Sequence, residues 1–172
     1  MSSLAFENIK LLALDVDGVM TDGKLYFSAQ GDEIKAFSIL DGHGIKMLLN
    51  SDIHVAIITG RSSPLVARRA RDLGIEHIIQ GREDKKVALL ELLNELELAP
   101  SDAAYMGDDL PDLGAIVAAK IGFTVPNAHA FIKEHADYCT HTPGGQGAVR
   151  EVCDLILESK GLLQPLLKAY LV

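Results

Sequence analysis

The sequence predicts an α/β fold in which helices cover both faces of a parallel β-sheet, giving three layers (α/β/α). The first observation behind this prediction is an alternation along the chain. Short apolar runs are followed by longer segments in which apolar residues recur with helical spacing. The second observation is that the short runs are almost continuously apolar, which is typical of parallel strands buried on both faces. The third is that polar clusters come directly after several of these runs.

Five apolar runs are expected to form the strands of the sheet. They are residues 9–14, 55–58, 77–79, 103–106 and 121–125. Acidic residues or a Thr-Gly pair follow the first, second and fourth runs. In an open parallel sheet, ligands bind at the carboxyl ends of the strands. We therefore expect a Rossmann-like sheet whose binding site lies along this edge.

Four segments are expected to be helices, namely residues 44–49, 64–73, 84–98 and 146–158. The clearest of them is 84–98, where six residues form a broad apolar stripe and Asp84 serves as a cap or first-turn acid. The stripe consists of Val87, Leu89, Leu90, Leu92, Leu93 and Leu96.

One segment interrupts the alternation of strands and helices. Residues 24–27 and 33–37 are strand-like and flank a turn that contains Gly31, which predicts a β-hairpin. The hairpin forms a flap at about residues 22–38, between the first strand and the first helix. We expect it to project over the carboxyl end of the sheet.

Composition narrows the class of protein. With 172 residues, 48% of them hydrophobic, the chain is expected to form one domain over residues 1–172 with an apolar tail at about 160–172. A net charge of −8 argues against nucleic-acid binding, which requires a basic face. No apolar run reaches the ~18 residues of a membrane span. Residues 1–7 do not resemble a signal peptide and the two cysteines are expected to be reduced, so we expect a cytoplasmic protein.

Two acidic clusters indicate a divalent cation. Asp15 and Asp17 follow the first strand, and strand alternation places both on the same side. Two such carboxylates repel each other unless a cation compensates, and Mg²⁺ prefers oxygen ligands. Asp108 is the expected missing ligand, with Asp109 and Asp112 as outer partners or structural caps. The alternatives are a calcium-like surface loop or helix cap at the first cluster and a simple turn or cap at the second.

Two further positions are expected to contact a phosphate. Thr59 and Gly60 end the second strand, where a hydroxyl and exposed backbone N–H groups bind phosphate oxygens. The alternative is that Thr59 caps the following helix. Lys85 lies at the start of a helix, from which it is expected to reach the phosphate and Asp15. Helical periodicity does not distinguish it from Lys86.

These clusters form an ordered set that resembles a known superfamily. Asp-Val-Asp-Gly at 15–18, Thr-Gly-Arg at 59–61, a lysine before a helix and Gly-Asp-Asp-Leu-Pro-Asp at 107–112 are similar to the motifs of the haloacid dehalogenase superfamily of phosphotransferases. The rest of the chain, including Pro-Gly-Gly-Gln-Gly-Ala-Val-Arg-Glu-Val at 143–152, is similar to one branch. That branch is the 3-deoxy-D-manno-octulosonate 8-phosphate (KDO 8-phosphate) phosphatase family of lipopolysaccharide synthesis. The resemblance implies a phosphoric monoester hydrolase with a haloacid-dehalogenase-like fold and no cap domain.

The resemblance implies a role for each matching residue. Asp15 is the nucleophile that forms an aspartyl-phosphate, and Asp17 protonates the leaving sugar oxygen and then activates water. Asp15 and Asp108 hold Mg²⁺ through their carboxylates, and Asp17 through its backbone carbonyl. Thr59 and Lys85 bind the phosphoryl oxygens.

The resemblance also implies a set of substrate-binding residues. These are Asp17, Ser38, Ile39, Leu40, Asp41, Gly42, Lys46, Gly60, Arg61, Arg69 and Lys85. Arg61 and Arg69 are expected to present cations to a sugar carboxylate, one of them from a neighbouring subunit, although Arg69 also fits a solvated helix face. Arg61 favours the octulosonate branch, since relatives that act on nonulosonate phosphates tend to carry Glu there.

Two departures from the family pattern leave open which sugar phosphate is the substrate. Leu40 stands where many members have Arg in Val-Arg-Asp-Gly, and Gln146 where many have Arg in Gly-Gly-Arg-Gly. A phosphatase for a nonulosonate 9-phosphate, or for many sugar phosphates, is therefore the first alternative. The second is a non-catalytic regulatory module, although the nucleophile, acid, lysine and metal ligand that such a relative should lack are all present. A binding protein for a divalent ion is the third, but it leaves Thr59 and Lys85 unexplained.

The resemblance implies a homotetramer in which hairpins at residues 24–37 pack together and neighbours cover each site. An isolated hairpin is only marginally stable in water, which is a physical reason to expect association. The apolar stretch at residues 162–172 is expected either to pack on its own domain or to cover a neighbouring site.

Overall fold

A six-stranded sheet forms the centre of the protein in a computed structural model that describes residues 6–171. The strand order is β5-β4-β1-β6-β7-β8, and every pairing in this sheet is parallel. The strands are β1 (Leu11–Leu14), β4 (His54–Thr59), β5 (His77–Gln80), β6 (Ala103–Met106), β7 (Ile121–Thr124) and β8 (Tyr138–Cys139). The order of the strands reverses at β1, so β4 and β6 lie on either side of it.

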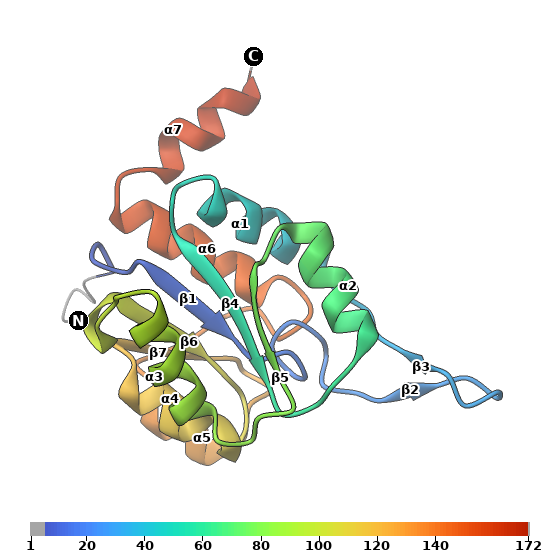
Figure 1. The fold of residues 1–172 in the computed structure, drawn as a ribbon. Helices are drawn as coiled ribbons and strands as arrows, with labels where there is room; N and C mark the ends of the chain where they lie inside the picture. The colour runs from blue at the N-terminus through green and yellow to red at the C-terminus, as the bar shows by residue number, and fades with distance from the viewer. Residues whose placement is uncertain (1–5, 172) are drawn as a thin grey trace.

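Helices cover both faces of the sheet (Figure 1). One layer holds α1 (Ile39–Leu49), α2 (Pro64–Leu73) and α6 (Ala148–Ser159), and the other α3 (Lys85–Glu95), α4 (Leu113–Ala118) and α5 (Ala130–His135). All four residues of β1 are buried, as expected for a central strand covered on both sides. The predicted α/β/α class is therefore confirmed.

The first helix is longer than the sequence predicted. We expected it to begin at Gly44, but α1 begins at Ile39 with Ser38 as its N-cap. Glycines inside a helix usually weaken it, yet α1 contains both Gly42 and Gly44. Here α6 packs closely on α1, and a Cβ at Gly44 would lie 2.8 Å from the Cδ of Arg150. The close approach of the two helices explains the glycine.

The expected apolar stripe on the third predicted helix was too broad. In α3 the buried apolar residues are Ala88, Leu89, Leu92 and Leu93, whereas Val87 is 47% and Leu90 38% exposed. The helix also ends at Glu95 rather than at residue 98.

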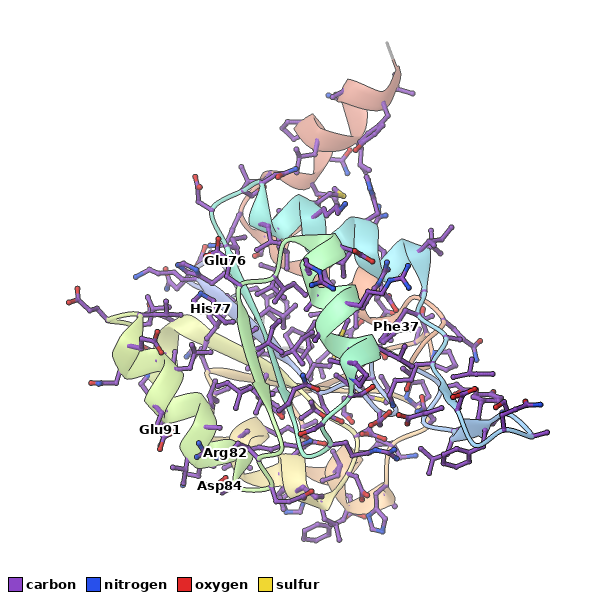
Figure 2. All side chains as sticks on the ribbon, turned by 45° about the vertical axis from the view of Figure 1, so that its right-hand side comes forward. Phe37, Glu76, His77, Arg82, Asp84 and Glu91 are labelled. Atoms are coloured by element: carbon purple, nitrogen blue, oxygen red, sulfur yellow. The ribbon has the colours of Figure 1, made fainter. Side chains whose placement is uncertain are left out.

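Asp84 occupies the N-cap position of α3 without accepting a cap hydrogen bond through its side chain. Its carboxylate instead accepts from Arg82 Nε and Nη2 at 2.6 and 2.9 Å, and Arg82 Nη1 donates to Glu91 at 3.0 Å. These three residues lie together on the outer side of α3 (Figure 2). Exposed pairs of this kind contribute little to stability.

The short elements α4, α5 and β8 were not predicted from the sequence. The two helices have six residues each and β8 has two. Six residues make fewer than two helical turns, so an apolar periodicity cannot be distinguished from chance.

The predicted hairpin forms a second sheet that projects from the body of the protein (Figure 1). It consists of β2 (Tyr26–Phe27) and β3 (Glu33–Ile34), which pair antiparallel. Its large apolar side chains are solvent-exposed: Phe27 by 62% and Ile34 by 55%. Within residues 6–171, no helix has both the length and the apolar character needed to cross a membrane.

The C-terminal stretch continues α6 with a turn, then α7 (Leu163–Lys168) and a 3₁₀ turn, η3 (Ala169–Leu171). Leu163 is buried against the core, and the Tyr170 hydroxyl lies 3.1 Å from His43 Nε2 on α1. Leu171 is 85% exposed. The stretch thus contacts its own chain through Leu163 and Tyr170, while Leu171 stays exposed. Val172, also part of the predicted apolar tail, lies outside the described residues.

Candidate active site

The carboxyl ends of β1, β4 and β6 meet the start of α3 around a cavity of about 290 Å³. Asp15 directly follows the central strand β1, and its backbone N–H donates to Met106 O on β6 at 2.9 Å. The cavity is lined by Asp15, Asp17, Gly23, Thr59, Gly60, Arg61, Glu83, Lys85, Asp108, Asp109, Pro111 and Asp112. Residues that are far apart in the sequence therefore meet at the edge where a ligand was expected.

Three carboxylates come together at this edge. One oxygen from each of Asp15, Asp108 and Asp112 lies within 4.8 Å of the others. Burial, with the nearby Asp112 carboxylate, raises the pKa of Asp15 from 3.8 to about 7. Burial, with Asp15 and Asp112, also raises the pKa of Asp108 to about 7. The cluster thus holds more negative charge than its surroundings stabilise.

Lys85 supplies one compensating charge from the first turn of α3. Its Nζ donates to Asp15 Oδ1 and to Asp112 Oδ1, both at 2.7 Å, and the residue is 5% exposed. Burial disfavours the charged ammonium, but the two carboxylates outweigh it and raise the pKa of Lys85. Lys86 is exposed. Of the two lysines left open by the sequence, only Lys85 lines the cavity.

Asp112 is fully buried and uses both of its oxygens inside the protein. Oδ1 accepts from Lys85 and from the Tyr105 hydroxyl at 2.8 Å. Oδ2 accepts from the backbone N–H groups of Asp108 and Asp109 at 3.1 and 3.2 Å. Asp112 therefore fixes the position of its neighbours, and the oxygens left for a cation belong to Asp15 and Asp108.

Tyr105 was missed by the sequence analysis, which treated residues 103–106 only as an apolar strand. Its side chain is fully buried and donates to Asp112. Burial and the Asp112 charge raise the pKa of Tyr105 well above its usual value, so the hydroxyl keeps its proton. The one signal in the sequence was a hydroxyl group inside an otherwise apolar strand.

The oxygen chemistry of the cluster fits Mg²⁺. Among residues 6–171, Asp108 Oδ1 is a buried carboxylate oxygen with no hydrogen-bond partner. Such an atom is costly unless something binds it, and hard cations take carboxylate oxygens. Gly18 has φ +94°, and a Cβ there would lie 1.9 Å from Asp108 Oδ2. The glycine therefore lets the backbone after Asp17 approach Asp108 closely.

The Asp17 carboxylate lies outside the three-carboxylate cluster. Its Oδ1 accepts from Lys35, and its Oδ2 lies 3.9 Å from Arg61 Nε. Sequence analysis missed Lys35 and its neighbour Glu33, because the hairpin was expected to project over the carboxyl end of the sheet and to mediate association, and no residue in it was assigned a role at the site.

Thr59 ends β4 at the cavity and is 2% exposed. The alternative that Thr59 caps the next helix is wrong, because Ser63 is the N-cap of α2 and its hydroxyl accepts from Leu65 N at 3.3 Å. Gly60 lies against Glu83, since a Cβ at Gly60 would be 2.3 Å from Glu83 Oε1. A hydroxyl and a closely packed backbone therefore face the same cavity as Lys85.

Comparison with known proteins relates this chain to a family of phosphatases. A family model described as haloacid dehalogenase-like hydrolase matches residues 75–152. The KDO 8-phosphate phosphatase of Salmonella typhi is 50% identical over 157 residues, which are 91% of this chain and 84% of the relative. The chain belongs to the KDO 8-phosphate phosphatase family.

Solved structures of the KDO 8-phosphate phosphatase family agree with this assignment. The enzyme from Moraxella catarrhalis, in complex with magnesium ion, phosphate ion and a KDO molecule, has a TM-score of 0.97 and 46% identity over 99% of each chain. The cobalt-bound form of the Haemophilus influenzae phosphatase has a TM-score of 0.89 and 43% identity, covering 92% of this chain and 93% of that one. The family resemblance inferred from the motifs is thereby confirmed.

Residues expected to bind the sugar in this family divide into two groups within one chain. Arg61 lines the cavity with Asp15. Ile39, Gly42, Lys46 and Arg69 line a second cavity of about 220 Å³ beside α1 and α2. One chain therefore does not bring all the expected sugar-binding residues together.

Three of the expected sugar-binding residues have structural contacts of their own. The Asp41 carboxylate is buried and its Oδ1 accepts from Arg150 N at 2.9 Å, so it caps the start of α6. Burial raises the pKa of Asp41 to about 6. Arg69 Nη2 donates to Ser38 O at 3.0 Å, while Arg69 Nε is buried without a partner among the described residues. Arg69 is thus not part of a solvated helix face, unlike Arg68, whose side chain is 75% exposed.

The free energy of unfolding of the metal-free protein is expected to fall as the pH rises towards about 8. The pKa values of Asp15 and Asp108 are about 7 in the folded protein, against 3.8 ordinarily. Stabilisation by these protonated carboxyls is complete below about pH 4 and is lost as the pH rises through about 7, with a slope near 1.4 kcal/mol per pH unit for one proton.

Mg²⁺ reverses this trend, because it binds the ionised carboxylates. The rise in Tm on adding MgCl₂ is expected to be larger at about pH 8 than at about pH 5.5, as differential scanning fluorimetry can measure. NaCl at equal ionic strength is the control. An equal rise at both pH values would contradict the assignment of the cation to these two groups.

Proposed function

We propose that the protein is a Mg²⁺-dependent phosphomonoesterase that hydrolyses KDO 8-phosphate to the free sugar acid and phosphate in lipopolysaccharide biosynthesis. One observation carries the proposal. The Asp15 carboxylate follows the central strand, accepts from Lys85 and clusters with the carboxylate of Asp108, whose buried Oδ1 has no hydrogen-bond partner, in a chain 50% identical to phosphatases of this name. A simple ion-binding protein requires neither the buried lysine nor Thr59 at the same cavity.

The first half of the reaction transfers the phosphoryl group to Asp15. A carboxylate oxygen of Asp15 attacks phosphorus, and the bond from phosphorus to the sugar oxygen breaks. Asp17 gives its proton to that oxygen, which leaves as the sugar hydroxyl. Because Asp17 lies outside the carboxylate cluster, its side chain is available for this proton transfer.

The second half returns the enzyme to its starting state. Asp17, now ionised, takes a proton from water as the water oxygen attacks phosphorus. The bond between Asp15 and phosphorus breaks, and inorganic phosphate leaves. Asp15 is again a carboxylate and Asp17 again carries a proton, so the cycle is balanced.

The phosphoryl oxygens carry the negative charge that the site must stabilise. Lys85 remains charged because its pKa is raised, and Thr59 contributes a hydroxyl and the backbone after β4. Mg²⁺, held by Asp15, Asp108 and the backbone carbonyl of Asp17, supplies positive charge for the same oxygens when it is bound. Asp112 and Tyr105 keep Lys85 and the Asp108 loop in position.

Phosphate release tests this function. We expect Mg²⁺-dependent release from KDO 8-phosphate with a higher kcat/KM than from a nonulosonate 9-phosphate or from common hexose phosphates. A higher kcat/KM for the nonulosonate ester would assign the protein to the alternative substrate. Absence of release from every ester in the presence of Mg²⁺ would favour a non-catalytic module.

The separation of the two cavities supports an assembly in which neighbouring subunits share a site. Lys46 and Arg69 of one copy then present cations to the sugar carboxylate of a substrate bound at Asp15 of another. We propose a homotetramer of single-domain subunits, residues 1–172, that associate through the hairpin. Both cysteines are free thiols, which agrees with the proposed cytoplasmic location.

Phe27→Glu is expected to convert the tetramer into smaller species, because it places a charge on an apolar side chain that is 62% exposed at the hairpin. Size-exclusion chromatography with light scattering measures the mass of each species. Gln30→Glu, at the exposed turn of the same hairpin, is the control and should leave the tetramer intact. A Phe27→Glu protein that remains tetrameric would exclude the hairpin as the main contact.

A further inference from the structure

A buried lysine lies beside the proposed acid–base residue. The side chain of Lys35, which follows β3, is only 3% exposed. Its Nζ donates to Asp17 Oδ1 and lies 3.4 Å from Glu33 Oε1. Glu33 Oε1 also accepts from Arg61 Nη2 at 2.8 Å. Two cations and one additional carboxylate therefore surround Asp17, and two of these three groups come from the hairpin.

The burial of Lys35 distinguishes it from an ordinary surface lysine. Lys24, in the same hairpin segment, has a side chain that is 73% exposed and lies 3.7 Å from Asp22. A buried ammonium is costly unless it is paired and hydrogen-bonded. Asp17 lines the active-site cavity, whereas Lys35 is not among its lining residues. Its contact with the reaction is through Asp17.

We propose that Lys35 is a positioning residue that holds the Asp17 carboxyl group in the orientation needed for proton transfer. The inference rests on the proposed phosphatase function and extends it to the hairpin. A general acid must come within about 2.6–3.2 Å of the oxygen that it protonates. A misplacement of about 1 Å can cost about 100-fold in rate. Lys35 engages one oxygen of Asp17, and the carboxyl group therefore has one preferred orientation at the cavity.

The competing interpretation is that Lys35 only attaches the hairpin to the body of the protein. Lys35 and Phe37 both line a third cavity, and Phe37 lies beside α2 (Figure 2). Substitution of a purely structural residue lowers kcat/KM equally for every substrate, since the residue acts on the fold. A positioning residue affects a substrate in proportion to its need for a proton on the leaving oxygen.

Two esters separate these interpretations. The leaving group of a sugar phosphate is a strongly basic alkoxide unless it is protonated. The leaving group of p-nitrophenyl phosphate is a weakly basic phenolate. The ratio kcat/KM reports the steps up to departure of the leaving group and excludes hydrolysis of the aspartyl-phosphate. We expect Lys35→Met to lower kcat/KM at least about tenfold for KDO 8-phosphate and less than about threefold for p-nitrophenyl phosphate.

Lys24→Met is the matched control and should leave kcat/KM unchanged for both esters. Combining Lys35→Met with Asp17→Asn should add no further loss for the sugar phosphate, because the two residues act as one unit. Equal losses for both esters, no loss for either, or additive losses in the double variant would each overturn the proposal. Should Lys35→Met fail to fold, as judged by circular dichroism, Lys35→Gln gives the same comparison.

The proposed function can fail independently of this inference. Activity of the wild-type protein on KDO 8-phosphate is measured first. Where another sugar phosphate is the better substrate, that ester replaces KDO 8-phosphate in the comparison, and the proposal for Lys35 is tested unchanged. Wild-type protein that hydrolyses p-nitrophenyl phosphate but no sugar phosphate would overturn both.

Discussion

Asp15→Asn is expected to lower kcat by at least about 10⁴-fold while the protein remains folded. An amide has no carboxylate oxygen to attack phosphorus, so the aspartyl-phosphate does not form. Loss of a residue that acts as the nucleophile typically costs several orders of magnitude. Release of phosphate from KDO 8-phosphate in saturating Mg²⁺ measures this effect.

Although Asp15→Asn should lose activity, its thermal stability should not decrease. Burial and the Asp112 charge raise the pKa of Asp15 to about 7, so an ionised carboxylate at this position destabilises the metal-free protein. The neutral amide removes that cost, and the Tm of metal-free Asp15→Asn at about pH 8 should equal or exceed that of the wild type. Loss of activity therefore cannot be explained by unfolding.

Asp52→Asn provides a matched control for the same chemical change. Asp52 is exposed in the turn between α1 and β4, at the opposite end of β4 from the site, and has φ 56°. Asparagine tolerates this left-handed conformation, so neither activity nor Tm should change appreciably. Activity of Asp15→Asn within about tenfold of the wild type would refute covalent catalysis by this residue.

The parts of the site that were predictable from the sequence are those that depend on topology. Asp15 and Asp108 come after apolar strands and Thr59 ends one, and parallel strands bring their carboxyl ends to one edge of the sheet. The fold class followed from the same pattern. Strand ends specify the neighbourhood of a residue but not the direction of its side chain.

The contacts that were missed depend on packing between elements distant in the sequence. Tyr105 and Asp112 meet through a turn whose geometry no periodicity encodes. Lys35 pairs with Asp17 only because the hairpin folds back onto the first loop. Asp41 caps α6, which begins more than a hundred residues later in the chain. None of these pairings has a local sequence signal.

The contrast between Lys85 and Lys86 shows what packing adds to a sequence motif. The two residues are adjacent and chemically identical, yet one is 5% exposed against two carboxylates and the other is exposed. Only the fit of α3 against the sheet, with Ala88 and Leu89 buried, determines which lysine faces the cavity.

Lys85→Met is accordingly expected to lower kcat by about 10²–10³-fold, the usual effect of removing one group that stabilises developing charge. Lys86→Met should leave kcat nearly unchanged, because the aliphatic part of Lys86 packs near Gly114 and methionine retains most of it. Equal losses in the two variants would contradict the assignment of Lys85 to the phosphoryl oxygens.

The same substitution should destabilise the metal-free protein in a pH-dependent manner. Lys85→Met leaves the buried Asp15 and Asp112 without their cation, and breaking a buried pair typically costs about 3–5 kcal/mol. The loss should be greatest at about pH 8 and should shrink as the pH falls through about 7, where Asp15 takes up a proton. Urea unfolding of metal-free protein at both pH values measures this difference. A loss that is independent of pH would mean that Lys85 stabilises the fold through its aliphatic chain rather than through its charge.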